Sequence, residues 1–255
     1  MTIITLKKSF KITTAIISAL LISACATYKP QSIIEQANNT AKIPTHTFYI
    51  AGGHGNGPIN ENLQNVLQSY LAKADKESTL LFTGDFVQEG VASEETIKAQ
   101  VAARLELKKD FKGKTYFVLG DNEWSSKNAD DIEWVEDYIK DNDIKKTEVE
   151  PNNVCPLEYR ELTDDLDMIL VDSQWYIANW DRVEKINNKC TDIVTRRRFA
   201  TELEGYIKDA RNKNLVIVML HPIYSNGTYA KSIGGFSPKQ ANFERYNDLR
   251  IIVSS

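Results

Sequence analysis

The chain has 255 residues, enough for one substantial domain, and 42% of them are hydrophobic, as in proteins with a packed core. The formal net charge at pH 7 is −4. An acidic chain lacks the basic face that contacts to nucleic-acid phosphates require, so the composition argues against a nucleic-acid partner.

Residues 1–24 are predicted to be a signal peptide. Three lysines precede an uncharged stretch over residues 12–24, which is shorter than the roughly 20 apolar residues of a membrane-spanning helix. The stretch ends in Ile22-Ser23-Ala24-Cys25, which resembles a bacterial lipobox, where cleavage precedes a cysteine that carries diacylglycerol. The alternative is an ordinary signal peptide that happens to contain a cysteine. Cleavage would remove three lysines and no acid, which leaves a net charge of −4 − 3 = −7.

The lipobox resemblance implies an anchored protein of the bacterial cell envelope, on the periplasmic or the surface side of a membrane. Residues 25–45 then form a polar tether, and residues 46–255 form the domain. Each buried CH₂ of an acyl chain contributes about 0.8 kcal/mol, so several chains on Cys25 would hold the protein firmly.

Two further cysteines, Cys155 and Cys190, are expected to form a disulfide. An exported protein meets an oxidising compartment, where such a pair bonds. The closed loop would span 190 − 155 + 1 = 36 residues and would stabilise the fold by about 3–4 kcal/mol in the loop-entropy model. The alternative is a pair of free buried thiols.

In chain order, short apolar runs alternate with amphipathic segments after the tether. The apolar runs predict strands over residues 47–51, 79–83, 115–119, 168–171 and 215–220. Apolar residues at helical spacing predict helices over residues 60–71, 97–105, 132–139, 199–210 and 237–253. This alternation indicates an α/β fold whose strands are buried on both faces.

Two of these segments carry specific expectations. The first strand, residues 47–51, is expected to be buried because its residues are almost all apolar. The first helix is expected to have one apolar face, because its apolar residues recur at i, i+3, i+4, i+7 and i+8 from Leu63.

Chemically active residue types follow the predicted strands directly. Gly52-Gly53, Gly84-Asp85, Gly120-Asp121 and His221-Pro222 each follow a strand end. In open α/β sheets ligands bind at that edge, so these loops are expected to converge on one crevice. Carboxylates and imidazoles there suit a divalent metal. The structural alternative is that a carboxylate after glycine only caps the next turn.

These segments resemble the motifs of the calcineurin-like metallophosphoesterases, especially their purple-acid-phosphatase-like branch. Leu80–Asp85, Tyr116–Trp124 and Val216–Gly227 look like the second, third and fourth motifs, and the resemblance covers roughly Phe48–Ile251. It implies a layered sandwich of β-sheets flanked by helices, two bound metals and phosphate-ester hydrolysis. The fifth motif, Gly-His-x-His, is missing before Ser255, so the resemblance also implies a domain that is incomplete at its C-terminus.

Several residues depart from the family pattern. Gly53 stands at the position of the first-motif aspartate. Asn122 replaces the histidine that donates a proton in the family, and an amide cannot shuttle a proton near neutral pH. Leu220 stands where the fourth-motif histidine ligand belongs, and His221 lies one residue further along. These replacements predict that the two-metal centre is weak or absent.

Some candidate ligands remain. The resemblance makes Asp85 the residue that bridges two metals, and Asp121 stands in the place of an asparagine ligand. Together with His54 and Asn122, these two carboxylates could bind one hard cation such as Mg²⁺ or Ca²⁺. His46, the third histidine of the chain, is expected at the surface.

Three functional hypotheses follow. The first is a phosphoesterase fold that binds a protein or phosphate-ester partner without hydrolysis. The second is an active phosphoesterase with one metal on Asp85 and Asp121, in which His54 or His221 supplies the proton. The third is a fragment of a longer or decayed gene product. The first is preferred because most of the family's ligands are replaced.

Overall fold

The computed structural model describes residues 44–52, 61–87, 93–126, 128–143, 147–178 and 189–221. All of them lie in the unit Pro44–Ser255. The predicted signal peptide, Cys25, His54 and the last predicted helix fall outside these residues. Within the described part of the chain, no helix is long and apolar enough to cross a membrane.

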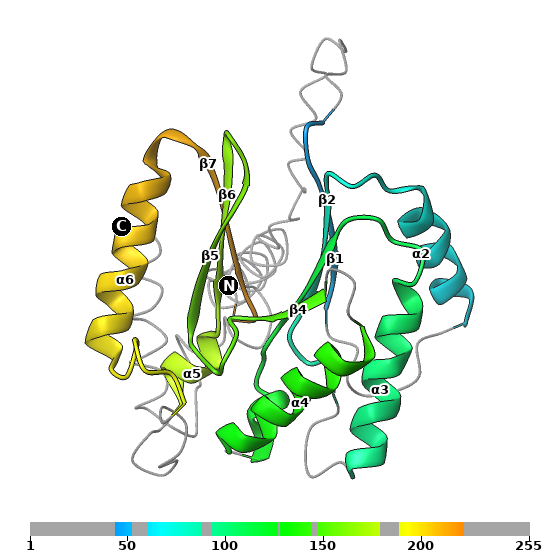
Figure 1. Cartoon of the computed structure of the whole chain (residues 1–255), viewed down its shortest axis with the longest axis horizontal. Helices are drawn as coiled ribbons and strands as arrows, with labels where there is room; N and C mark the ends of the chain where they lie inside the picture. The colour runs from blue at the N-terminus through cyan, green and yellow to red at the C-terminus, as the bar shows by residue number, and fades with distance from the viewer. Residues whose placement is uncertain are drawn as a thin grey trace, which may run out of the picture. The chain divides into compact units, whose positions relative to one another are not determined.

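The first half of the unit is a parallel sheet covered by helices (Figure 1). Its strands, in spatial order, are β1 (Thr47–Ala51), β2 (Ser78–Thr83), β3 (Lys114–Val118) and β4 (Thr147–Glu150). The connecting helices are α2 (Glu61–Lys73), α3 (Glu94–Leu107), the short 3₁₀ turn η1 (Glu123–Ser126) and α4 (Ala129–Asn142). Side-chain caps start two of these helices, since Ser93 accepts from the Thr96 N–H and Asn128 from the Asp130 N–H.

The second half is a three-stranded mixed sheet with a helix on its outer face (Figure 1). Its strands are β5 (Leu157–Thr163), β6 (Leu166–Val171) and β7 (Asn214–Met219), of which β5 and β6 are antiparallel and β6 and β7 parallel. Its helical segments are α5 (Ser173–Ile177), α6 (Arg196–Asp209) and η3 (Ala210–Asn212). Thr195 caps α6 by accepting from the Arg198 N–H.

Side chains from both sheets form a shared inner core. Its buried members are Leu81, Tyr116, Val118, Met168, Leu170 and Val218. The alternate residues of the same strands face the helices and join a second, larger core. The layers are therefore helix, sheet, sheet and helix. This arrangement confirms the predicted α/β layered sandwich, in which each sheet has helices on one face and the other sheet on the opposite face.

The sequence analysis missed β4 and β5. Both are edge strands in which polar residues outnumber apolar ones, so neither contains a continuous apolar run. The expectation that residues 47–51 are buried was wrong. The strand β1 forms the edge of its sheet, and 70% of Ile50 is exposed. His46 is half-buried rather than on the surface, and its Nε2 lies 2.9 Å from Thr79 Oγ1.

The apolar residues of α2 lie on one side of the helix, as predicted, but only part of that side is buried. Leu67 and Leu71 pack into the core. Leu63, Val66 and Tyr70 lie with them in one arc of about 140° around the helix and are 45%, 52% and 63% exposed. The predicted apolar face is therefore divided into a buried edge and an exposed edge.

Candidate functional site

The loops that follow β2, β3, β6 and β7 meet at one edge of the sandwich. Gly84, directly after β2, donates its N–H to Val118 O of β3 at 2.7 Å. After β6, Ser173 contacts His221, which follows β7, with Oγ 2.8 Å from Nδ1. The predicted convergence of these strand ends is therefore seen in the described residues.

Gly84 and Asp85 form a sharp left-handed turn. Their φ angles are +70° and +54°. Glycine adopts this conformation readily, whereas an aspartate pays a conformational cost. One oxygen of the Asp85 carboxylate accepts the Asn122 N–H at 3.3 Å. The second-motif carboxylate thus braces the neighbouring loop.

Leu220 occupies the space between these glycine loops. A Cβ added to Gly84 would lie 2.9 Å from Leu220 Cδ1, and one added to Gly120 would lie 2.9 Å from Leu220 Cδ2. Both methyl groups therefore lie against the glycines that precede Asp85 and Asp121. At this point the edge is lined by a hydrocarbon side chain, which offers no ligand atom.

Glu123 is a central residue of the site to which the sequence analysis gave no role. Its carboxylate accepts three backbone N–H groups, from Asp85 at 3.0 Å, Val87 at 3.0 Å and Gly120 at 2.8 Å. Burial raises its pKa to about 7, although the Val87 and Gly120 N–H groups act in the opposite direction. The sequence contained one indication of this role, because Glu123 is the last residue of the Gly120-Asp121-Asn122-Glu123 motif.

Asn122 is buried and its amide is used structurally. Its Nδ2 donates to Val87 O at 3.0 Å, and only 8% of the residue is exposed. The side chain that replaces the family's histidine therefore helps Glu123 to hold the segment after β2.

His221 is buried against the residues that follow β6. Ser173 Oγ lies 2.8 Å from its Nδ1 and also accepts its backbone N–H at 3.3 Å. Burial lowers the pKa of His221 to about 4, and the Asp121 carboxylate opposes this shift only partly. The imidazole is therefore neutral near pH 7 and carries no proton to donate as imidazolium.

A buried aspartate links the two sheets at the same edge. Asp172, the cap of α5, accepts the Trp175 N–H at 2.9 Å and the Trp124 Nε1–H at 2.6 Å. Burial raises its pKa to about 7. Trp124 belongs to the third-motif segment, so this bond ties that segment to the second sheet.

Comparison with known proteins assigns this arrangement to a family. A family model described as calcineurin-like phosphoesterase matches residues 46–255. The chain belongs to the calcineurin-like phosphoesterase family. Searches of curated proteins and of solved structures gave no significant match.

Proteins of this family generally bind divalent metals, and the residues of this phosphoesterase domain can be tested for that role. Asp85 accepts one backbone N–H, Glu123 accepts three, and the Asn122 amide nitrogen is bonded to a carbonyl. Leu220 presents only methyl groups to the glycine loops. Among the residues that the structure describes, no three His, Cys, Asp or Glu side chains lie close enough to hold an ion. The described residues therefore do not fit a two-metal centre. His54 and Gly53 lie outside them.

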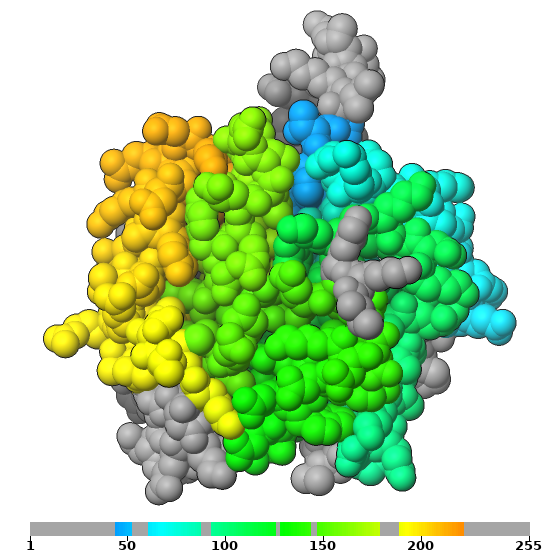
Figure 2. All heavy atoms as spheres, in the orientation of Figure 1, coloured from blue at the N-terminus to red at the C-terminus, as the bar shows by residue number. Residues whose placement is uncertain are grey.

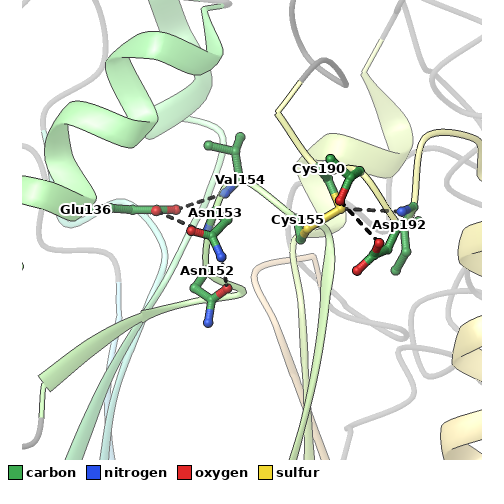
Figure 3. The surroundings of a disulfide bond; sticks show 9 residues. Glu136, Asn152, Asn153, Val154, Cys155, Cys190 and Asp192 are labelled. Carbon is green, nitrogen blue, oxygen red and sulfur yellow. Dashed lines mark hydrogen bonds between the residues drawn. A yellow bond between two sulfur atoms is a disulfide. The ribbon is translucent and has the colours of Figure 1, made fainter.

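The phosphoesterase domain contains a disulfide near this edge (Figure 3). Cys155 and Cys190 are bonded, with Cα atoms 4.8 Å apart. Glu136 of α4 accepts the N–H groups of Asn153 and Val154, each at 3.1 Å, just before Cys155. Both of these residues have φ of +54°, which is strained for a β-branched side chain such as valine. The carboxylate and the disulfide hold this turn from two sides.

A cluster of charged side chains joins the two sheets at the β4–β5 side. Arg160 of β5 forms ion pairs with Glu148 and Glu150 of β4 and with Glu158 of its own strand. Glu150 is fully buried, and burial raises its pKa to about 8, with the nearby Glu148 acting in the same direction. Near pH 7 a protonated Glu150 is therefore favoured although Arg160 opposes it, and its uncharged carboxyl accepts the Arg160 N–H. The contact becomes an ion pair as the pH rises through about 8.

The free energy of unfolding is expected to rise when the pH falls from about 9 to about 6. Glu150 has a pKa of about 8 in the fold against 4.5 as its ordinary value. The contribution of Glu150 to the free energy of unfolding is therefore complete below its ordinary pKa of 4.5 and is lost as the pH rises through about 8. Glu123, Glu136 and Asp172, each with a pKa of about 7, act in the same direction. Urea titrations at the two pH values measure the change.

The matched variants are Glu150→Gln and Glu158→Gln, which each remove one partner of Arg160. Only Glu150→Gln should reduce the difference between the two pH values, and an unchanged difference would contradict the role given to Glu150. The comparison stops near pH 6 because of His221, whose pKa is lowered in the folded state. Below about 6.5 this histidine binds a proton in the unfolded chain but not in the fold, so it lowers the free energy of unfolding as the pH falls further.

Proposed function

We propose that this chain is an envelope lipoprotein whose calcineurin-like phosphoesterase domain binds a ligand or protein partner without hydrolysing phosphate esters. The arrangement of Leu220 carries this proposal. Its methyl groups lie against Gly84 and Gly120, the two loops that present Asp85 and Asp121. A pair of cations needs oxygen or nitrogen ligands at this point, and a leucine provides none.

The protein groups at this edge support the same proposal. Catalysis of phosphate-ester hydrolysis needs a proton donor near the leaving oxygen. Asn122 cannot donate a proton in that way, and His221 is neutral and buried against Ser173. The loops are instead held together by Glu123, which needs no metal to do so.

Metal content and turnover test the proposal together. The full chain is purified and its bound metals are measured, and aryl-phosphate hydrolysis is followed with Mn²⁺, Zn²⁺ or Mg²⁺ added. We expect no substantial bound metal and no steady turnover. The control is Asp85→Ala, which removes the carboxylate assigned as bridging ligand. Bound Mn, Fe or Zn with turnover that Asp85→Ala abolishes would replace this proposal with an active enzyme that uses a reduced metal site.

The lipid anchor is the second part of the proposal. The sequence Ile22-Ser23-Ala24-Cys25 after an uncharged apolar stretch supports diacylglycerol on Cys25. Mass spectrometry of the N-terminal peptide should show acyl chains on that cysteine. A mature chain that starts elsewhere, or that carries no lipid at Cys25, would overturn this part alone.

A further inference from the structure

The outer surface of α2 carries a stripe of apolar side chains. Leu63, Val66 and Tyr70, which we call the α2 stripe, follow one another at i, i+3 and i+7 and are 45%, 52% and 63% exposed. Five large hydrophobic residues are exposed in the described part of the chain, and three of them belong to this stripe. Figure 2 shows α2, in light blue, at the surface of the unit.

The helix α2 carries few charged residues. The helix contains one acid, Glu61, and one base, Lys73. At 3.6 residues per turn, Glu61 lies on a different side of the helix, whereas Lys73 continues the line from Val66 and Tyr70. The mature chain predicted from the lipobox carries a net charge of −4 − 3 = −7. The stripe itself adds no negative charge, so it opposes contact with an anionic surface less than an acidic part of the chain would.

We propose that the α2 stripe rests on the lipid bilayer beside the anchor. Leucine and valine insert readily at the level of the headgroups, tyrosine is enriched there, and a lysine at the end of the stripe suits anionic lipids. This inference rests on the proposed anchor at Cys25.

The tether makes even a small apolar patch sufficient for such a contact. It spans 45 − 25 + 1 = 21 residues. A chain of that length reaches at most about 75 Å even when it is fully extended. The domain therefore stays within reach of the bilayer, and the contact forms as an intramolecular event at a high effective concentration.

Site-specific quenching in vesicles tests the contact. The full lipidated chain is reconstituted in vesicles of phosphatidylethanolamine and phosphatidylglycerol, with and without brominated acyl chains. Tyr70→Trp places a reporter in the stripe. Val194→Trp is the matched control, because Val194 is also exposed, at 44%, and precedes α6 on the opposite outer layer. The fluorescence of the unsubstituted chain is subtracted from each.

Brominated lipid should quench the fluorescence added by Tyr70→Trp and leave that added by Val194→Trp unchanged. Adding Leu63→Gln and Val66→Gln should reduce the quenching, since both positions are exposed and tolerate polar side chains. An unquenched Tyr70→Trp signal, or equal quenching at both positions, would overturn the proposal. Shielding of Tyr70→Trp from acrylamide that grows with protein concentration in detergent would overturn it as well, in favour of a second copy on the stripe.

These experiments distinguish a failure of the proposed lipid anchor from a failure of the proposed stripe contact. If mass spectrometry finds no lipid on Cys25 but the chain stays on vesicles with Tyr70→Trp quenched, the stripe contact stands without the anchor. If Cys25 is acylated and Tyr70→Trp remains unquenched, the anchor stands and the stripe contact is rejected. A chain that does not associate with vesicles overturns both.

Discussion

Replacing Glu123 by alanine is expected to reduce the free energy of unfolding by about 3–5 kcal/mol, because the change removes the acceptor of two buried backbone N–H groups and one partly buried N–H group. These groups belong to Asp85, Val87 and Gly120, and their distances to the carboxylate range from 2.8 to 3.0 Å. A single unsatisfied buried group costs about 1–3 kcal/mol, and neighbouring losses are not fully additive. Urea denaturation followed by far-UV circular dichroism measures the loss.

Two controls separate this effect from the loss of any glutamate. Glu133→Ala removes a glutamate that is half exposed and pairs with Lys189, and it should change stability by less than about 1 kcal/mol. Glu123→Gln keeps one carbonyl oxygen as acceptor and should cost less than Glu123→Ala. Equal stability of Glu123→Ala and Glu133→Ala would show that the carboxylate does not hold the loops.

Removing the disulfide is expected to reduce the free energy of unfolding by about 3–4 kcal/mol. The bond closes a loop of 190 − 155 + 1 = 36 residues, and an open loop of this length gives the unfolded chain that much more conformational freedom at 25 °C. The double change Cys155→Ser and Cys190→Ser removes the bond with little change in volume. Its urea midpoint should fall in the absence of any reductant.

The reductant provides the internal control for this prediction. Dithiothreitol should lower the midpoint of the unsubstituted chain and leave that of the double variant unchanged. A stability equal to that of the unsubstituted chain would contradict the predicted contribution. A similar loss with a changed denaturant slope would point to a different unfolded state, so the slope is compared as well.

Glu123 and Glu136 show why part of the site could not be predicted from the sequence. Asp85 and Asp121 were predicted because each follows a glycine at a strand end, and the strand ends do meet. Glu123 accepts the N–H of Val87, which lies 36 residues away in the chain. Glu136 accepts the N–H of Val154, which lies 18 residues away. A bond between such distant groups leaves no local pattern in the sequence.

The sequence by itself determined the strand and helix alternation, the glycine loops after β2 and β3, and the family motifs around Asp85 and Asp121. These features depend on short-range apolar periodicity and on the conformational freedom of glycine, which neighbouring residues are enough to specify. The tertiary structure alone decided which strands belong to each sheet, that β1 is an exposed edge, that Leu220 packs on Gly84 and Gly120, and that part of the apolar face of α2 is exposed. The reason is that the direction in which a side chain is buried depends on the partner packed against it, and that partner comes from a distant part of the chain.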